Sequence, residues 1–304
     1  MKRFRKLLVG LDLTADGDRI TTGSRKAAVQ AQWLAAKTGA ELTFLHSTYH
    51  DRFEDHQIMR LGPSEDGALE LESLVREYSD AGVPTELVYS EERPWLAMIR
   101  RVLAGKNDLV VVAKRNESAD DQRPIGSLSL KLLRKCPSPV WVVKPDHDLV
   151  HRLVIAATDL TEVGDLATEF GAYVAAAHDC DLQVLHAWQI SFELQMEAAQ
   201  LSDEELTARK KEIEEQAVGH IRGVLQPLGM TRNVGLHVLN DAPSRAILRE
   251  VEESDPDVLV MGTLSRGGIA GFLVGNTAEK LLERVDCSLL TIKPDDFVSP
   301  VLPD

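Results

Sequence analysis

The chain has 304 residues, of which 44% are hydrophobic, and it carries a formal net charge of −14 at pH 7. This length accommodates two domains that each bury a core, and the negative charge argues against nucleic acid as a partner. The apolar run near the N-terminus is too short for a secretory signal or a membrane span, and Cys136, Cys180 and Cys287 lack CxxC spacing. These features predict a cytoplasmic protein with buried cysteines, no disulfide and no membrane insertion.

The sequence repeats itself once along its length. The tetrapeptide LDLT at residues 11–14 returns as TDLT at residues 158–161, and other short echoes follow in the same order. Two copies of one unit predict two similar domains, which we place at residues 1–147 and 148–304.

Apolar runs rich in Val and Leu predict the buried strands of the first copy. The expected strands are residues 6–11, 42–46, 86–89, 109–112 and 140–143. Residues 25–38 place alanines at helical spacing and stop at Gly39, which suits a helix C-cap. Further helices are predicted around residues 71–78, from Pro94, and before the last strand.

The second copy predicts the same alternation of strands and helices. The expected strands are residues 153–157, 182–185, 235–238, 258–261 and 289–292, and the helices are residues 166–177, 203–228, from Pro243, and 278–284. Ser202 and Glu205 form a predicted capping box. We therefore expect an α/β fold in which each copy is a five-stranded parallel sheet with helices on both faces, Rossmann-like.

The last strands of the two copies, residues 140–143 and 289–292, are both apolar. Because apolar edge strands need cover, we expect these two strands to meet across a pseudo-twofold axis.

A glycine-rich loop follows the strand at 258–261. It spans residues 262–268, and Gly275 then opens the predicted helix at 278–284. Backbone N–H groups and a positive helix end thus converge at the carboxyl edge of the sheet, where anions bind. A tight turn without a ligand is the alternative interpretation.

Two tandem copies, an Asp after each first strand, a His in each second strand and this glycine spacing together resemble the universal stress protein family, in particular its tandem members. The residues 275–279 and 292–295 are the most specific part of the resemblance. The resemblance implies an adenine-nucleotide alpha hydrolase-like fold. In nucleotide-binding members the loop reads Gly-x2-Gly-x9-Gly-(Ser/Thr), a pattern that is incomplete in both copies here.

In the second copy, Gly262 and Gly275 match the pattern, followed by Thr277. Ser265 stands at the second glycine position and Asn276 at the hydroxyl position. The resemblance implies that this copy is the better candidate for a nucleotide, with a weakened site.

In the first copy, Gly126 and Ser127 match, but Ala113 and Asn116 stand at the two earlier glycine positions. Three carboxylates in the same loop, which would repel a triphosphate, are Glu117, Asp120 and Asp121. We expect no nucleotide in this copy.

The resemblance also places Asp12 and Asp159 against the base and ribose, together with the backbone of Ser47 and Ala187. The alternative for each Asp is a strand-end residue that caps the following turn. The histidines that precede Ser47 and Ala187 are expected to be hydrogen-bonded core residues, and no pattern predicts a metal site.

The resemblance implies a ligand-responsive stress-response factor and not an enzyme, although slow ATP hydrolysis stays open. Its cofactor is ATP or ADP with Mg²⁺ if a nucleotide binds, and otherwise none. The alternative is a scaffold or binding protein that holds an apolar ligand in the second domain, beneath the apolar segment 189–200. We expect the two domains to pack as a pseudo-dimer, while a homodimer of the chain and an unidentified protein partner stay open.

Overall fold

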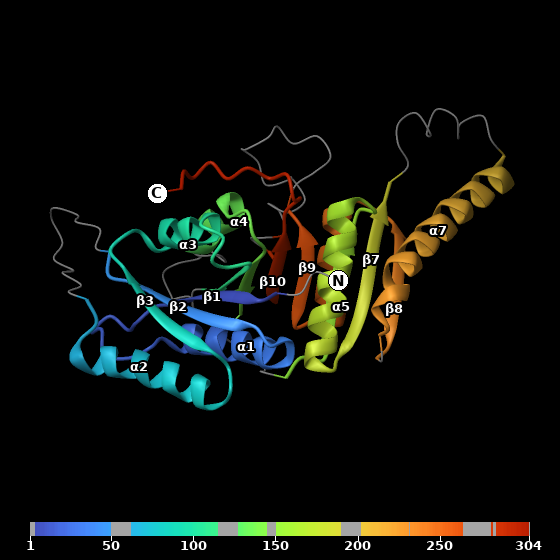
Figure 1. Cartoon of the computed structure of the whole chain (residues 1–304). Helices are drawn as coiled ribbons and strands as arrows, with labels where there is room; N and C mark the ends of the chain where they lie inside the picture. The colour runs from blue at the N-terminus through green and yellow to red at the C-terminus, as the bar shows by residue number, and fades with distance from the viewer. Residues whose placement is uncertain are drawn as a thin grey trace.

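The computed structural model describes residues 4–49, 62–114, 127–144, 150–189, 202–230, 232–263, 281 and 284–303. One ten-stranded sheet runs through both halves of the chain, in the order β3-β2-β1-β4-β5-β10-β9-β6-β7-β8 (Figure 1). Every neighbouring pair of strands is parallel except β5 and β10.

Each half contributes five neighbouring strands and the helices that connect them. The first half contains β1 (Lys6–Leu11), α1 (Thr22–Thr38), β2 (Glu41–Ser47), α2 (Glu65–Asp80), β3 (Thr85–Ser90), α3 (Pro94–Leu103), β4 (Leu109–Ala113), α4 (Ser127–Lys135) and β5 (Val140–Val143). The second half contains β6 (Leu153–Thr158), α5 (Glu162–His178), β7 (Asp181–Trp188), α7 (Asp203–Leu225), η1 (Gln226–Leu228), β8 (Val234–Asn240), α8 (Pro243–Ser254), β9 (Val258–Gly262) and β10 (Ser288–Ile292).

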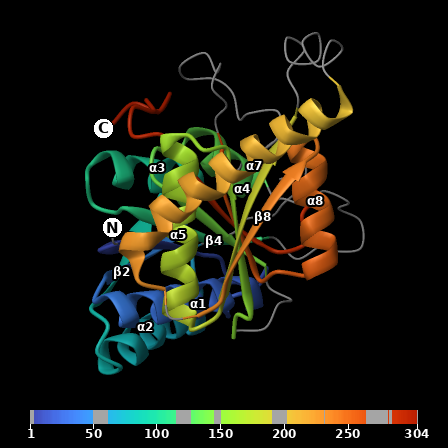
Figure 2. The same cartoon turned by 90° about the vertical axis from the view of Figure 1, so that its right-hand side faces the viewer.

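Apolar side chains leave the strands alternately toward two cores, one on each face of the sheet. Leu7 and Val9 of β1 enter the core under α1, α2, α5 and α7, whereas Leu8 enters the core under α3, α4 and α8. Figure 2 shows α5 and α7 lying in front of the sheet and α8 beside it. The predicted α/β fold with helices on both faces is thereby confirmed.

The helix ends follow local sequence signals. Gly39 caps α1 with φ at 71°, and Ser202 and Glu205 form the predicted capping box of α7. The helices α1 and α5 begin earlier than predicted because Thr21 and Thr161 accept hydrogen bonds from N–H groups of their first turns. The helix α7 ends at Leu225, earlier than predicted, since the following 3-10 turn contains a proline, which lacks an N–H group.

The two halves are joined by antiparallel pairing of their last strands, β5 and β10. Trp141 lies opposite Leu290, and Val142 lies opposite Leu289. All residues of both strands are buried, so each covers the apolar edge of the other. The predicted meeting of these strands is confirmed.

The C-terminal segment of the second half lies over helices of the first half (Figure 1). The hydroxyl of Ser299 donates to the carbonyl oxygen of Lys135, the last residue of α4, at 2.8 Å. Within the part of the chain that the structure describes, no helix is long and apolar enough to cross a membrane.

Candidate functional site

The carboxyl ends of β2, β1 and β4 lie side by side in the first half. Asp12 follows β1, Ser47 ends β2 and Ala113 ends β4, and all three line one cavity of about 990 Å³. Ser127, the first residue of α4, lines it as well. The structure thus brings together four of the residues predicted for the first half, while Asn116 and Gly126 lie outside the described residues.

The wall of this cavity combines an apolar surface with charged groups. Its apolar and aromatic lining includes Leu11, Leu13, Leu45, Tyr49, Trp95, Met98, Val112 and Leu128. Its charged lining consists of Asp12, Asp16, Arg93, Lys114 and Lys131. A ligand here would meet carboxylates after β1 and cations from the start of α3, the end of β4 and α4.

Two of the cations are held against aromatic rings. The guanidinium of Arg93 lies 5.3 Å from the Tyr49 ring centroid, and its Nε donates to the Tyr49 hydroxyl at 3.0 Å. The ammonium of Lys131 lies 5.4 Å from the Trp95 ring centroid. Sequence reasoning missed these four residues because their approach depends on tertiary packing of the loop after β2 and the helices α3 and α4.

The strand histidines are the hydrogen-bonded core residues that we predicted. His46 Nδ1 lies 3.1 Å from the carbonyl oxygen of Leu11, and His186 Nδ1 lies 2.9 Å from that of Thr158. Because a carbonyl only accepts, Nδ1 is the donor in both rings. Each histidine thereby ties the end of one strand to its neighbour, and its role is structural.

In the second half, Asp159 follows β6, Ala187 lies near the end of β7 and Gly262 ends β9, three neighbouring strands. Asp159 Oδ1 accepts from the backbone N–H of Thr161 at 3.1 Å and from its hydroxyl at 2.5 Å. This carboxylate oxygen therefore supports the turn before α5, which is the capping role that we considered for it. Ser265, Gly275, Asn276 and Thr277 lie outside the described residues.

Gly262 is required by packing as well as by the predicted loop chemistry. A Cβ at this position would lie 2.8 Å from Cγ1 of Val163, in the first turn of α5. Gly164 is similarly confined, since a Cβ there would lie 2.7 Å from Asp159 Oδ1. The start of α5 thus packs closely onto the strand ends, a contact that sequence spacing did not reveal.

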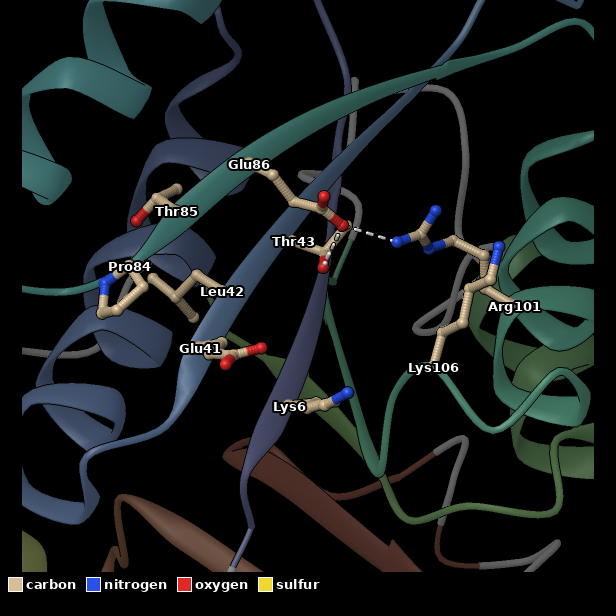
Figure 3. A pocket seen from close by; sticks show the side chains of 9 residues that line it. All are labelled: Lys6, Glu41, Leu42, Thr43, Pro84, Thr85, Glu86, Arg101 and Lys106. Carbon is tan, nitrogen blue, oxygen red and sulfur yellow. Dashed lines mark hydrogen bonds and ion pairs between the residues drawn. The ribbon is translucent and has the colours of Figure 1, made fainter.

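A second hollow, of about 510 Å³, lies near the start of β2 and β3 and is lined by Lys6, Glu41, Leu42, Thr43, Pro84, Thr85, Glu86, Arg101 and Lys106. Figure 3 shows Glu86 between Thr43 and the guanidinium of Arg101. The Thr43 hydroxyl and Arg101 Nη2 donate to Glu86 Oε1 at 3.0 and 2.6 Å. Asn107 closes the ring: it accepts from Arg101 Nε and donates to the Thr43 hydroxyl, both at 3.3 Å.

The second half has a related polar cluster in the same position relative to its sheet. Gln183 of β7 donates to Glu250 Oε1 of α8 at 2.7 Å, and His237 Nδ1 lies 3.2 Å from that oxygen. Burial alone would raise the pKa of Glu250, but the hydrogen bonds from Gln183 and His237 outweigh it and lower the pKa. Both clusters satisfy polar groups from within the chain and hold a helix against the sheet.

The fold is a tandem α/β fold with a cavity at a carboxyl strand edge, the place where doubly wound folds bind ligands. The family model of the universal stress protein family matches residues 3–144 and 151–293. The chain therefore belongs to the universal stress protein family, as a tandem member.

Relatives of full length share this organisation. The chain is 26% identical to universal stress protein E of Escherichia coli (strain K12) over 314 residues, covering 99% of this chain and 98% of that protein. It is 24% identical to universal stress protein E of Photorhabdus laumondii, with the same coverage. A universal stress protein from Archaeoglobus fulgidus has a TM-score of 0.62 at 20% identity, covering 95% of this chain and 98% of that chain, and it supports the fold.

Proposed function

We propose that this tandem universal stress protein is a cytoplasmic, ligand-responsive stress-response factor and not an enzyme. The observation that carries the proposal is the cavity of about 990 Å³ at the carboxyl edge of the first half, a volume typical of small-molecule sites. Two polar side chains in its wall are bonded to the backbone: the Ser47 hydroxyl donates to the carbonyl of Glu92 at 2.6 Å, and His46 is bonded to the carbonyl of Leu11. Such an arrangement favours binding over catalysis.

The proposal includes weak binding of ATP or ADP, with Mg²⁺, in the second half. Asp159, Ala187 and Gly262 stand at adjacent strand ends, where a nucleotide base and phosphates meet the sheet in doubly wound folds. Affinity is expected to be low because Asp159 Oδ1 already supports the turn of Thr161.

A matched pair of variants assigns the nucleotide to one half. ATP, ADP and AMP are titrated by calorimetry at fixed magnesium and salt into the wild type, Asp159→Ala and Asp12→Ala. The proposal expects saturable binding that Asp159→Ala weakens at least tenfold and Asp12→Ala leaves unchanged. Circular dichroism checks the fold, because loss of a turn-capping side chain costs about 1 kcal/mol. If only Asp12→Ala loses nucleotide binding, the nucleotide site lies in the first half and the proposal is wrong.

The second candidate is a scaffold that holds an apolar ligand. The apolar and aromatic wall of the first-half cavity favours it, while the segment 189–200, predicted to cover a second-half cavity, lies outside the described residues apart from Gln189. A fluorescent fatty acid tests this alternative: saturable binding of the probe, with no saturable signal from any adenine nucleotide, would replace the nucleotide proposal. Release of phosphate from ATP is expected to stay at the level of the buffer.

A further inference from the structure

Two histidines and two tryptophans, which we name the histidine cluster, meet where the two halves join. His151, two residues before β6, stacks on His178, the last residue of α5, with ring centroids 4.0 Å apart and planes at 24°. Trp141 of β5 stands edge-on to both imidazoles, at 6.3 and 6.4 Å. Trp33 of α1 lies 5.7 Å from His178. The two histidines belong to the second half and the two tryptophans to the first half, so both halves contribute to the cluster.

The centre of the cluster is buried, while its edge reaches solvent. Trp141 is fully buried and His151 is 4% exposed, whereas Trp33 is 36% exposed. Both ring nitrogens of His178 are buried and form no hydrogen bond within the described part of the chain. Burial and then the neighbouring His151 lower the pKa of His178, against an opposing effect of Asp257, to about 3. His178 is accordingly neutral at pH 7.

Four charged or titratable groups surround the cluster, and the two carboxylates among them have partners of their own. Asp257 accepts from the backbone N–H groups of Arg152 and Leu153 at 2.6 and 3.0 Å. Asp179, which caps α5, pairs with Arg232 at 2.5 Å, and Lys37 lies in the last turn of α1. Burial raises the pKa of the Cys180 thiol to about 12, so this thiol stays protonated.

The matching position on the other side of the pseudo-twofold axis is aromatic. Phe4 stands two residues before β1, as His151 stands before β6, and it stacks on Phe170 of α5 at 4.7 Å and 8°. Tyr173, the twelfth residue of α5 as Trp33 is of α1, stands edge-on to Phe4 at 5.9 Å. Phe170 is the ninth residue of α5 and His178 the seventeenth, so the two stacks correspond at Phe4 and His151 and differ in their partners. Phe4 and Phe170 carry no group that titrates in acid.

We propose that the stacked His151 and His178 of the second half form, with Trp141 and Trp33 of the first half, an acid-sensitive contact between the two halves, which opens when the imidazoles take up protons from solvent while the Phe4 contact and the pairing of β5 with β10 persist. Two positive rings at 4.0 Å repel each other, and burial leaves His151 with little water. An imidazole released to solvent has a pKa of about 6.5. Below that pH, each further unit multiplies the open population by up to about tenfold for each ring that gains a proton.

Hydrogen exchange measured by mass spectrometry on the full chain tests this proposal, with rates corrected for the intrinsic pH dependence of exchange. Between pH 7.5 and 5.0, protection of peptides at the end of α5 is expected to fall at least tenfold, while peptides of β1 and β5 keep their protection. His178→Phe is expected to abolish the fall, because phenylalanine keeps an aromatic ring against His151 and takes up no proton. Phe4→His is expected to create a similar fall at the start of β1.

If a variant does not fold, hydrogen exchange of the wild type still tests the proposal. An equal loss of protection at both contacts in the wild type would overturn the proposal, since it would report general acid unfolding. An unchanged fall in a folded His178→Phe variant would overturn it as well.

Discussion

The buried ammonium group of Lys293, one residue beyond β10, donates a hydrogen bond to the carbonyl oxygen of Leu133 in α4, and so ties the second half to a helix of the first. Its counterpart Lys144, one residue beyond β5, forms an ion pair with Asp286 Oδ1 at 2.6 Å. Each half therefore reaches the other through the lysine that follows its last strand.

Stability is expected to rise between pH 8 and 10 through Lys293. Burial lowers the pKa of this lysine to about 8, whereas an unfolded chain has a value of about 10.4. Between those values the unfolded chain binds more protons, so the folded state gains stability as pH rises, by up to about 3 kcal/mol. Urea unfolding at pH 7.5 and 9.5 measures the gain, and Lys293→Met is expected to reduce it. An equal gain in the variant would show that other groups cause it.

The ring of Thr43, Glu86, Arg101 and Asn107 is expected to stabilise the first half. Arg101→Met removes two hydrogen bonds and leaves polar atoms of buried Asn107 without that partner, so we expect a loss of about 1–3 kcal/mol in unfolding free energy. The control is Arg76→Met, which breaks an exposed 4.0 Å ion pair with Glu72 and should cost less than about 0.5 kcal/mol. Equal losses in the two variants would contradict a structural role for the ring.

Gly262→Ala is expected to lower stability by about 1–3 kcal/mol because the new Cβ meets Val163. Val163→Ala in the same chain should restore most of that loss by removing the methyl groups at fault. Thermal unfolding of the single and double variants measures both effects. If the double variant is no more stable than Gly262→Ala, the contact with Val163 does not cause the loss of stability.

Restoring the family pattern in the second half, by Ser265→Gly with Asn276→Ser, is expected to strengthen ATP binding. Glycine removes a Cβ from the phosphate path, and serine supplies a compact hydroxyl donor. The same repair in the first half, Ala113→Gly with Asn116→Gly, should achieve less because three loop carboxylates remain. Calorimetry compares the ATP affinities of the two double variants. Tighter binding by the first-half variant would show that the loop carboxylates do not limit ATP binding.

Local sequence signals predicted most of the fold. Apolar runs located the strands, and the apolar character of residues 140–143 and 289–292, together with the resemblance to family dimers, predicted that β5 and β10 meet. The helix starts were less accurate because a threonine cap such as Thr21 leaves no apolar period in the first turn.

The candidate site divides in the same way. The resemblance to the family indicated strand-end residues such as Asp12, Ser47 and Ala113, and they come together because parallel strands bring their carboxyl ends to one edge. The approach of Arg93 to Tyr49 and the stacking of His151 on His178 were not, because both join segments whose relative placement depends on tertiary packing.

Calorimetric titration of the full chain with ATP, ADP and AMP at fixed magnesium and salt tests the central claim most directly. The account predicts saturable binding of an adenine nucleotide, which Gly275→Val weakens more than tenfold, equivalent to about 1.4 kcal/mol or more, since a branched side chain enters the predicted phosphate path. No saturable heat with any of the three nucleotides, or unchanged affinity in a folded Gly275→Val variant, would contradict it.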